Sequence, residues 1–211
     1  MKKKQYITAA VLLIAFAVWT VAVSLVDVQP IGPEGSAVGF AALNGWFHGL
    51  TGVHMALYEL TDLLSIVPLA LVAGFGLLGL VQWVRRKKLL AVDRSILALG
   101  GFYGAVLAAF VLFEVLEVNY RPVLIEGVLE ASYPSSTTML ALCVLVTAML
   151  QLRERMKEGA LRGLVLAALA AFAAFLVVGR VISGVHWLSD IVGGVLLSAG
   201  LIVAYAAAAK E

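Results

Sequence analysis

Long runs of apolar residues alternate with shorter polar stretches along the whole chain. Six of these runs approach or reach the roughly 20 residues with which a helix crosses the hydrocarbon core of a bilayer. We place the predicted spans at about 7–26, 63–84, 95–118, 135–152, 163–179 and 188–209. The pattern predicts an all-α, polytopic membrane protein in which residues 1–211 form a single six-span domain.

The polar stretch between the first two predicted spans is the longest of the chain. Within it, residues 40–60 mix aromatic, aliphatic and polar side chains, which favours a short amphipathic helix lying in the membrane interface. Thr61 or Asp62 is then expected to cap the second span. The first span follows three lysines, and we interpret it as a retained signal anchor because no convincing small-x-small cleavage site follows it.

The composition agrees with a membrane protein. Of the 211 residues, 63% are hydrophobic and 13% are charged, whereas a soluble domain carries roughly 25% charged residues. This balance excludes a disordered chain, a nucleic-acid-binding domain and an ordinary cytosolic enzyme. The single cysteine, Cys143, excludes an internal disulfide and a multi-cysteine metal site.

The basic residues collect on alternate sides of the predicted spans. If the N-terminus is cytoplasmic, the positive-inside rule places most of them, and both termini, on the cytoplasmic face of a cell (inner) membrane. The residues on that face are Lys2, Lys3, Lys4, Arg85, Arg86, Lys87, Lys88, Arg94, Arg153, Arg155, Lys157, Arg162 and Lys210. Arg121 and Arg180 remain at the extracytoplasmic ends of the third and fifth spans. Because basic residues there oppose the topology signal, we expect them to bind an anionic ligand.

Three segments that are far apart in the sequence fall on this extracytoplasmic face: 119–122, 133–138 and 179–190. Their two arginines carry planar, permanently charged groups that match phosphate oxygens. In the second segment, Pro134 is followed by small hydroxyl residues at a helix start, where backbone N–H groups and the helix dipole favour an anion.

The third segment contains a histidine and a carboxylate at helical spacing. His186 and Asp190 are four residues apart, so on one helical turn they face each other. A carboxylate on one imidazole nitrogen leaves the other nitrogen free to attack and stabilises the charge that develops. The sequence therefore predicts a phosphate site that could form a phosphohistidine without a metal.

The third segment resembles the third signature of the type-2 phosphatidic acid phosphatase superfamily, which includes lipid phosphate phosphatases and vanadium haloperoxidase-like proteins. The signature is S-R-x5-H-x3-D, and the chain has Arg180, His186 and Asp190 at this spacing, with Gly179 in place of the serine. The first segment is similar to the family's K-x6-R-P and the second to its P-S-G-H, in the family's order. The resemblance implies six spans, an extracytoplasmic site and no cofactor or metal.

The resemblance also implies a role for each matching residue. His186 would be the nucleophile and Asp190 the partner that orients it. Ser135 would contribute its hydroxyl to the phosphate, and Ser136, at the glycine position, its backbone N–H. The phosphate-binding residues would be Arg121, Ser135, Ser136 and Arg180.

Two positions depart from the family's pattern. Glu114 stands where the first motif has lysine, and Thr137 stands where the second has the histidine that protonates the leaving group. Loss of general-acid help typically costs about 10²–10⁴ in rate. Several explanations stay open: a diphosphate substrate that needs less help, a proton from Glu117, His54 or Glu126, or a site that binds lipid phosphate without turnover. Glu114 and Glu117, three residues apart, also leave a bound cation as an alternative.

The expected function is that of a membrane lipid phosphate or diphosphate phosphatase acting at the extracytoplasmic face through phosphorylated His186. A polyprenyl diphosphate such as undecaprenyl diphosphate is the hypothetical substrate favoured by Thr137. The expected partners are a lipid phosphate and the bilayer, not nucleic acid, and the oligomeric state is left open. The alternatives are a non-catalytic lipid-phosphate binding or transport-type protein and a lipid phosphotransferase.

Overall fold

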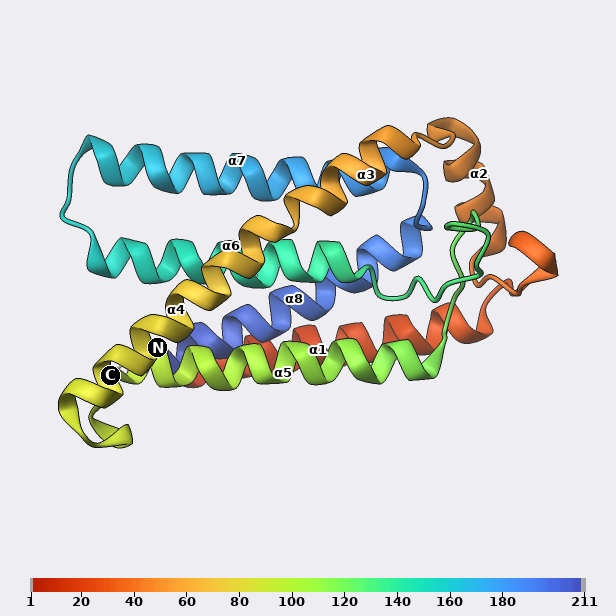
Figure 1. Ribbon diagram of the computed structural model, residues 1–211. Helices are drawn as coiled ribbons and strands as arrows, with labels where there is room; N and C mark the ends of the chain where they lie inside the picture. Colours follow the sequence, from red (N-terminus) through yellow and green to blue (C-terminus); the bar gives the residue numbers. More distant parts are fainter. Residues whose placement is uncertain (1, 210–211) are drawn as a thin grey trace.

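The computed structural model describes residues 2–209, so Lys210, assigned above to the basic face, lies outside the described residues. The chain forms an elongated helical bundle (Figure 1). Its helices are α1 (Lys2–Leu25), α2 (Ala41–Thr51), α3 (Met55–Leu64), α4 (Ile66–Arg86), α5 (Arg94–Leu116), α6 (Ser136–Arg155), α7 (Ala160–Ser183) and α8 (Leu188–Ala209), with 3-10 turns at Pro33–Gly35 and Leu89–Ala91. Between residues 2 and 209, β structure is limited to isolated bridges.

Six helical segments are long and apolar enough to cross a membrane: α1, the pair α3–α4, α5, α6, α7 and α8. The predicted all-α, six-span fold class is therefore confirmed. The second span differs most from its predicted range of 63–84, because its helix begins at Met55 rather than at Leu63. No proline or glycine interrupts residues 55–64, so the helical hydrogen bonding starts well before the apolar run.

The stretch 40–60, predicted as one amphipathic helix, contains all of α2 and the beginning of α3. Gly52 ends α2 with a φ of 65°, and α3 runs through Ser65 into α4. Asp62 therefore lies inside a helix instead of capping one, and the Thr61 hydroxyl donates back to the Leu57 carbonyl at 2.9 Å. Helix α2 packs against α7 and α8 at one end of the bundle.

The two ends of the bundle differ in charge. The two ends of the described chain, the turn after α4 and the α6–α7 connection lie at one end (Figure 1). The opposite end carries α2, the segment 117–135 and the turn 184–187. Arg121 and Arg180 belong to this second end, and the other described basic residues belong to the first.

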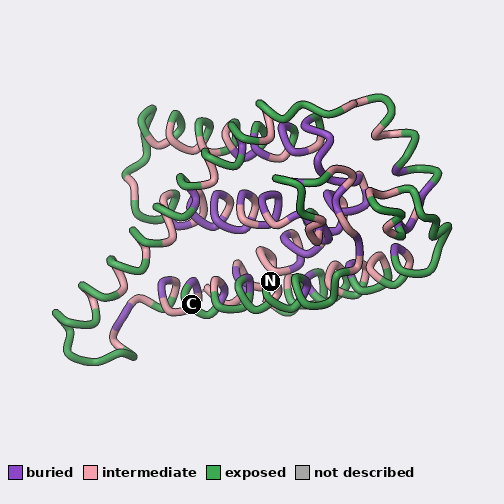
Figure 2. The backbone as a smooth tube through the Cα atoms, turned by 45° about the vertical axis from the view of Figure 1, so that its right-hand side comes forward, coloured by how far each residue is buried: buried purple, intermediate pink, exposed green. Residues whose placement is uncertain are grey.

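The most deeply buried helices are α6 and α8 (Figure 2), which carry Ser136, Thr137 and Asp190 of the predicted site. Helix α8 packs on α1, α5 and α6, and α7 covers α6. Small residues make these approaches possible, as expected where helices associate without a hydrophobic driving force between them. A Cβ atom on Gly200 would lie 2.8 Å from the side chain of Leu13 on α1, and one on Gly193 would lie 2.6 Å from the Tyr133 ring.

Candidate active site

The turn between α7 and α8 holds His186 in place. Gly184 adopts a left-handed conformation with a φ of 66°, and a Cβ atom there would lie 1.8 Å from the Gly52 carbonyl oxygen. The His54 backbone N–H donates to the Ser183 carbonyl at 2.9 Å, and the His48 ring contacts the Gly184 carbonyl at 3.1 Å. The linker between α2 and α3 therefore lies directly on this turn, and only glycine fits at position 184.

His186 lies between a cation and a carboxylate. Its Nε2 atom is 3.0 Å from Arg121 Nη1, and its Nδ1 atom is 3.7 Å from Asp190 Oδ2. A guanidinium only donates hydrogen bonds, so Nε2 is the acceptor and the proton of the neutral ring resides on Nδ1, which faces Asp190. The geometry therefore leaves the Nε2 lone pair on the side of the arginines, as a nucleophile toward a phosphate requires.

Burial keeps the imidazole neutral. His186 is 4% exposed, and this burial lowers the pKa of its side chain to about 4, although Asp190 acts in the opposite direction. The positive charges of Arg121 and Arg180 lower the pKa further. At neutral pH the nucleophilic form of His186 therefore predominates.

Asp190 is fixed by neighbours that the sequence analysis did not single out as site residues. Its Oδ2 accepts from the Trp187 backbone N–H at 3.0 Å, and its Oδ1 accepts from Asn119 Nδ2 at 3.1 Å. Asn119 also donates toward the Ser189 hydroxyl and accepts from the Gly39 backbone N–H. The position of Asn119 two residues before the arginine of the first motif was the available signal for this role.

Asn44 on α2 completes this buried polar network. Its side-chain amide donates to the Ser189 hydroxyl at 2.9 Å, and its side-chain oxygen accepts from the Ser189 backbone N–H at 3.1 Å. Both residues are fully buried. Helix α2 therefore holds the first turn of α8, which carries Asp190.

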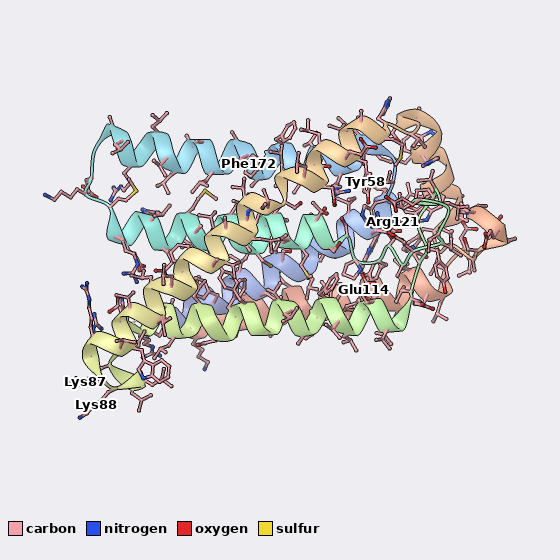
Figure 3. The ribbon with its side chains drawn as sticks, in the orientation of Figure 1. Tyr58, Lys87, Lys88, Glu114, Arg121 and Phe172 are labelled. Atoms are coloured by element: carbon pink, nitrogen blue, oxygen red, sulfur yellow. The ribbon has the colours of Figure 1, made fainter. Side chains whose placement is uncertain are left out.

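The two arginines converge over one aromatic ring. The guanidinium carbons of Arg121 and Arg180 lie 5.8 and 4.6 Å from the centroid of the Tyr58 ring on α3. Each arginine also has a carboxylate partner: Arg121 Nε contacts Glu130 at 2.9 Å, and Arg180 Nη2 contacts Asp62 at 2.6 Å. Figure 3 shows Tyr58 and Arg121 at the same end of the bundle, far from Lys87 and Lys88. Tyr58, Glu130 and Asp62 were not predicted as site residues, because their contacts exist only in the folded bundle.

The N-terminus of α6 adjoins this cluster. The Ser135 backbone N–H donates to the Asp190 carbonyl at 3.1 Å, and the Ser135 hydroxyl accepts from the Thr138 N–H at 3.4 Å as the helix N-cap. Ser135 is fully buried, and Thr137 is 8% exposed. Capping and phosphate binding are compatible for Ser135, because its hydroxyl proton is not used by the cap.

Two cavities meet at this point. The larger, of about 830 Å³, lies between α3–α4, α5 and α6, and its site end is lined by Asp62, Ser136 and Thr137. The remainder of its lining is almost entirely apolar. A much smaller cavity is lined by His186, Glu114 and Ser136, and it shares Ser136 with the larger one. His186 and an apolar chamber therefore lie on either side of the α6 N-terminus.

The structure places the other candidate proton donors elsewhere. The His54 ring contacts the Thr51 carbonyl, and Glu117 accepts from the Tyr120 hydroxyl. Glu126 lies in the tight turn 125–128. None of these three residues lines either cavity. Among residues 2–209 there is also no group of three or more histidine, cysteine or carboxylate side chains placed to hold a metal ion.

Comparisons with known proteins show what this chain is similar to. Residues 114–211 match the family model of the PAP2 superfamily. The fold is similar to that of a transmembrane PAP2-type phosphatidylglycerolphosphate phosphatase from Bacillus subtilis, with a TM-score of 0.57, 20% identity, and coverage of 94% of this chain and 93% of that one. A comparison with curated proteins gave no match. The matched residues contain the arginine pair, His186 and Asp190, so the part of the chain that carries the candidate site is similar to the PAP2 superfamily.

Proposed function

We propose that this chain is a membrane lipid phosphate or diphosphate phosphatase that works through a phosphohistidine on His186. The observation that carries the proposal is the state of Arg180. Its side chain is 1% exposed, and its Nε and Nη1 atoms have no hydrogen-bond partner among the described residues. Each buried, unpaired donor costs about 1–3 kcal/mol. A phosphate group would supply acceptors to these atoms.

The contacts support a two-step displacement. In the first step, His186 Nε2 attacks phosphorus while the bond to the leaving oxygen breaks, and Asp190 stabilises the positive charge that grows on the ring. Arg121, now at Nε2, would turn to the phosphate oxygens together with Arg180. In the second step, water attacks phosphorus, the P–N bond breaks, and inorganic phosphate leaves.

The apolar cavities support a lipid as the substrate. The cavity of about 830 Å³ reaches the α6 N-terminus, and a second one of about 460 Å³ continues along α4 and α5, sharing Val72 and Tyr103 with the first. Asp62 and Trp83 mark the two ends of this path, and 21 helical residues span roughly 30 Å. A hydrocarbon chain, including a polyprenyl chain, fits such a path while its phosphate stays with the arginines.

The charge distribution supports a site at the extracytoplasmic face. The end of the bundle opposite the site carries the basic clusters and both ends of the described chain. Loops rich in lysine and arginine stay in the cytoplasm. We therefore place the termini inside and the site outside a cell membrane.

Phosphate release from a purified lipid substrate tests the proposal. The protein in detergent should release phosphate from undecaprenyl diphosphate, phosphatidic acid or both, and His186→Ala should lower the rate by at least about 10³-fold. Rapid acid-free quenching with ³²P-labelled lipid should trap an acid-labile phosphoprotein in the parent chain alone.

Each other outcome points to a specific alternative. Label that moves to an acceptor lipid would identify a phosphotransferase. Saturable lipid binding without release would identify a binding or transport-type protein. Release that is equal in the parent chain and in His186→Ala would exclude the phosphohistidine mechanism.

A further inference from the structure

A carboxylate lies between Arg180 and the large cavity. Asp62 Oδ1 lies 2.6 Å from Arg180 Nη2, and Asp62 also lines the cavity of about 830 Å³ beside Ser136 and Thr137. Arg180 is the charged group that faces Asp62. Tyr103, on α5, is the other residue with an ionisable side chain in the lining of this cavity. Asp62 is thus the carboxylic acid that reaches both a phosphate ligand and the apolar chamber.

A close contact between α3 and α7 creates this position. Gly179 has the place of the serine in the family signature, and a Cβ atom on it would lie 2.7 Å from Thr61 Cγ2. Thr61 is fully buried. Thr61 directly precedes Asp62, and Gly179 directly precedes Arg180. The contact between Thr61 and Gly179 therefore brings Asp62 close to Arg180. The glycine at position 179, where the family signature has serine, therefore permits the helix contact that places Asp62 beside Arg180.

The location of the leaving group follows from the cavity. In a lipid phosphate, the leaving oxygen joins the phosphorus to the hydrocarbon part of the molecule. With the phosphate on the arginines and the hydrocarbon part in the cavity, this oxygen lies at the site end of the cavity, beside Asp62 and Thr137. A threonine hydroxyl is too weak an acid to protonate it near neutral pH, whereas a carboxyl group is a common general acid.

We propose that Asp62 is the general acid that protonates the leaving group, in place of the histidine that Thr137 replaces. This assignment rests on the proposed function and adds a catalytic residue to it. It also removes the need for a diphosphate as the explanation of Thr137, because a phosphate monoester with an alcohol leaving group then has a proton donor.

The proton balance closes within the site. A monoester monoanion carries one proton on its phosphate, and this proton passes to the Asp62 carboxylate as the arginines bind the resulting dianion. As Nε2 of His186 bonds to phosphorus, the P–O bond breaks, its electron pair stays on the leaving oxygen, and the Asp62 proton yields the free alcohol. The Asp62 carboxylate then takes a proton from the water that cleaves the P–N bond, and it passes this proton to the departing phosphate, which restores the carboxylate.

The dependence on the leaving group tests this role. Asp62→Asn should lower kcat on phosphatidic acid, which releases an alcohol, by about 10²–10⁴-fold. The same variant should lose less than about tenfold on 4-nitrophenyl phosphate, since nitrophenolate leaves without a proton. Retained activity on the aryl ester also shows that the variant is folded. Glu59→Gln, which changes an exposed carboxylate on the same helix, is the matched control and should alter neither rate.

A second variant restores a proton donor at position 137, where the family's motif has histidine. Thr137→His added to Asp62→Asn should recover at least tenfold of the lost rate on phosphatidic acid and leave the aryl ester unaffected. Equal losses on both substrates in Asp62→Asn would mean that Asp62 only holds Arg180, and would overturn the assignment. Unchanged or higher rates on both would show that Asp62 merely competes with phosphate, and would overturn it too. A parent chain active on undecaprenyl diphosphate alone would overturn the assignment too, because no alcohol is released, whereas a parent chain inactive on this lipid and on both esters would instead refute the proposed function.

Discussion

His186 shows how strongly a single residue depends on its surroundings. An exposed histidine has a pKa near 6.5 and is partly protonated in the cell. Burial lowers the pKa of His186 to about 4, against the opposing influence of Asp190. The unfolded chain binds a proton at this residue below about pH 6.5, whereas the folded chain does not until about pH 4. The folded state is therefore destabilised as the pH falls between these values.

We expect His186 to remain neutral well below pH 6. In ¹⁵N-histidine-labelled protein, the imidazole signals that disappear in His186→Gln should keep the shifts of a neutral ring down to about pH 5, with the proton on Nδ1. A midpoint near pH 6.5 for these signals would contradict the buried, cation-flanked environment.

Asn119 is a residue whose importance only its contacts reveal. It is 1% exposed and donates to Asp190, so under the proposed mechanism it would act through the carboxylate rather than by touching the phosphate. Asn119→Leu keeps the approximate volume but removes the donor. We expect kcat to fall by about 10–100-fold with little change in KM, a loss comparable to that seen when residues that orient metal ligands are replaced. A rise in KM at constant kcat would argue for a direct contact with substrate instead.

At the scale of elements, the connection between α4 and α5 is tied down at the end opposite the site. Asp93 accepts from Gln82 at 2.8 Å, and its carboxylate contacts Arg86 at 2.9 Å and Arg155 on α6 at 3.1 Å. The hydrogen bond from Gln82 is the main cause of the lowered pKa of Asp93, and both arginines add to it. This cluster holds α4, α5 and α6 together around the apolar cavities.

Removing the charge of Asp93 should loosen these three helices. We expect Asp93→Asn to lower the apparent melting temperature in detergent by about 2–4 °C, which corresponds to roughly 1 kcal/mol. Because the pKa of the native carboxyl is lowered, its contribution is complete above the ordinary value near 3.8 and is lost as the pH falls through the lowered one. Glu158→Gln, at an exposed i,i+4 pair with Arg162, is the control and should shift the melting temperature by less than 1 °C.

At the scale of the whole molecule, charge separation decides which end faces which compartment. Every described basic residue except Arg121 and Arg180 lies at the end with the termini. The site end carries the arginine pair, which we assign to a ligand rather than to topology. The proposed orientation therefore rests on the basic residues other than Arg121 and Arg180.

Cysteine labelling measures this orientation directly. Cys143 is fully buried, and its replacement by alanine gives a background for single cysteines at Val128, on the site end, and Glu158, on the other. In intact cells a membrane-impermeant maleimide should label Val128→Cys at once and Glu158→Cys only after permeabilisation. The reverse pattern would place the site in the cytoplasm.

The sequence predicted the fold class because crossing a bilayer requires long apolar helices, and that requirement is visible in composition alone. The sequence was less informative about helix boundaries where an apolar run adjoins an amphipathic segment. The second span begins at Met55 because α3 continues into α4. No residue in the sequence signals whether these two helices are continuous or separate. The short helix α2 likewise separates from α3 only because Gly52 takes a left-handed conformation in the folded chain.

The candidate site divides in the same way. Arg121, Arg180, His186 and Asp190 could be named in advance because phosphate chemistry demands those groups at readable spacings. Asn44, Tyr58, Asp62 and Asn119 could not, because they act through neighbours that are between about 60 and 145 positions away in the sequence. Pairing across such distances follows from helix packing, in particular from the contact of Gly179 with Thr61. By itself, then, the sequence determined a six-span bundle and predicted the candidate reactive groups. The tertiary structure alone decided which carboxylate stands beside which arginine, since helices approach one another only where small residues permit.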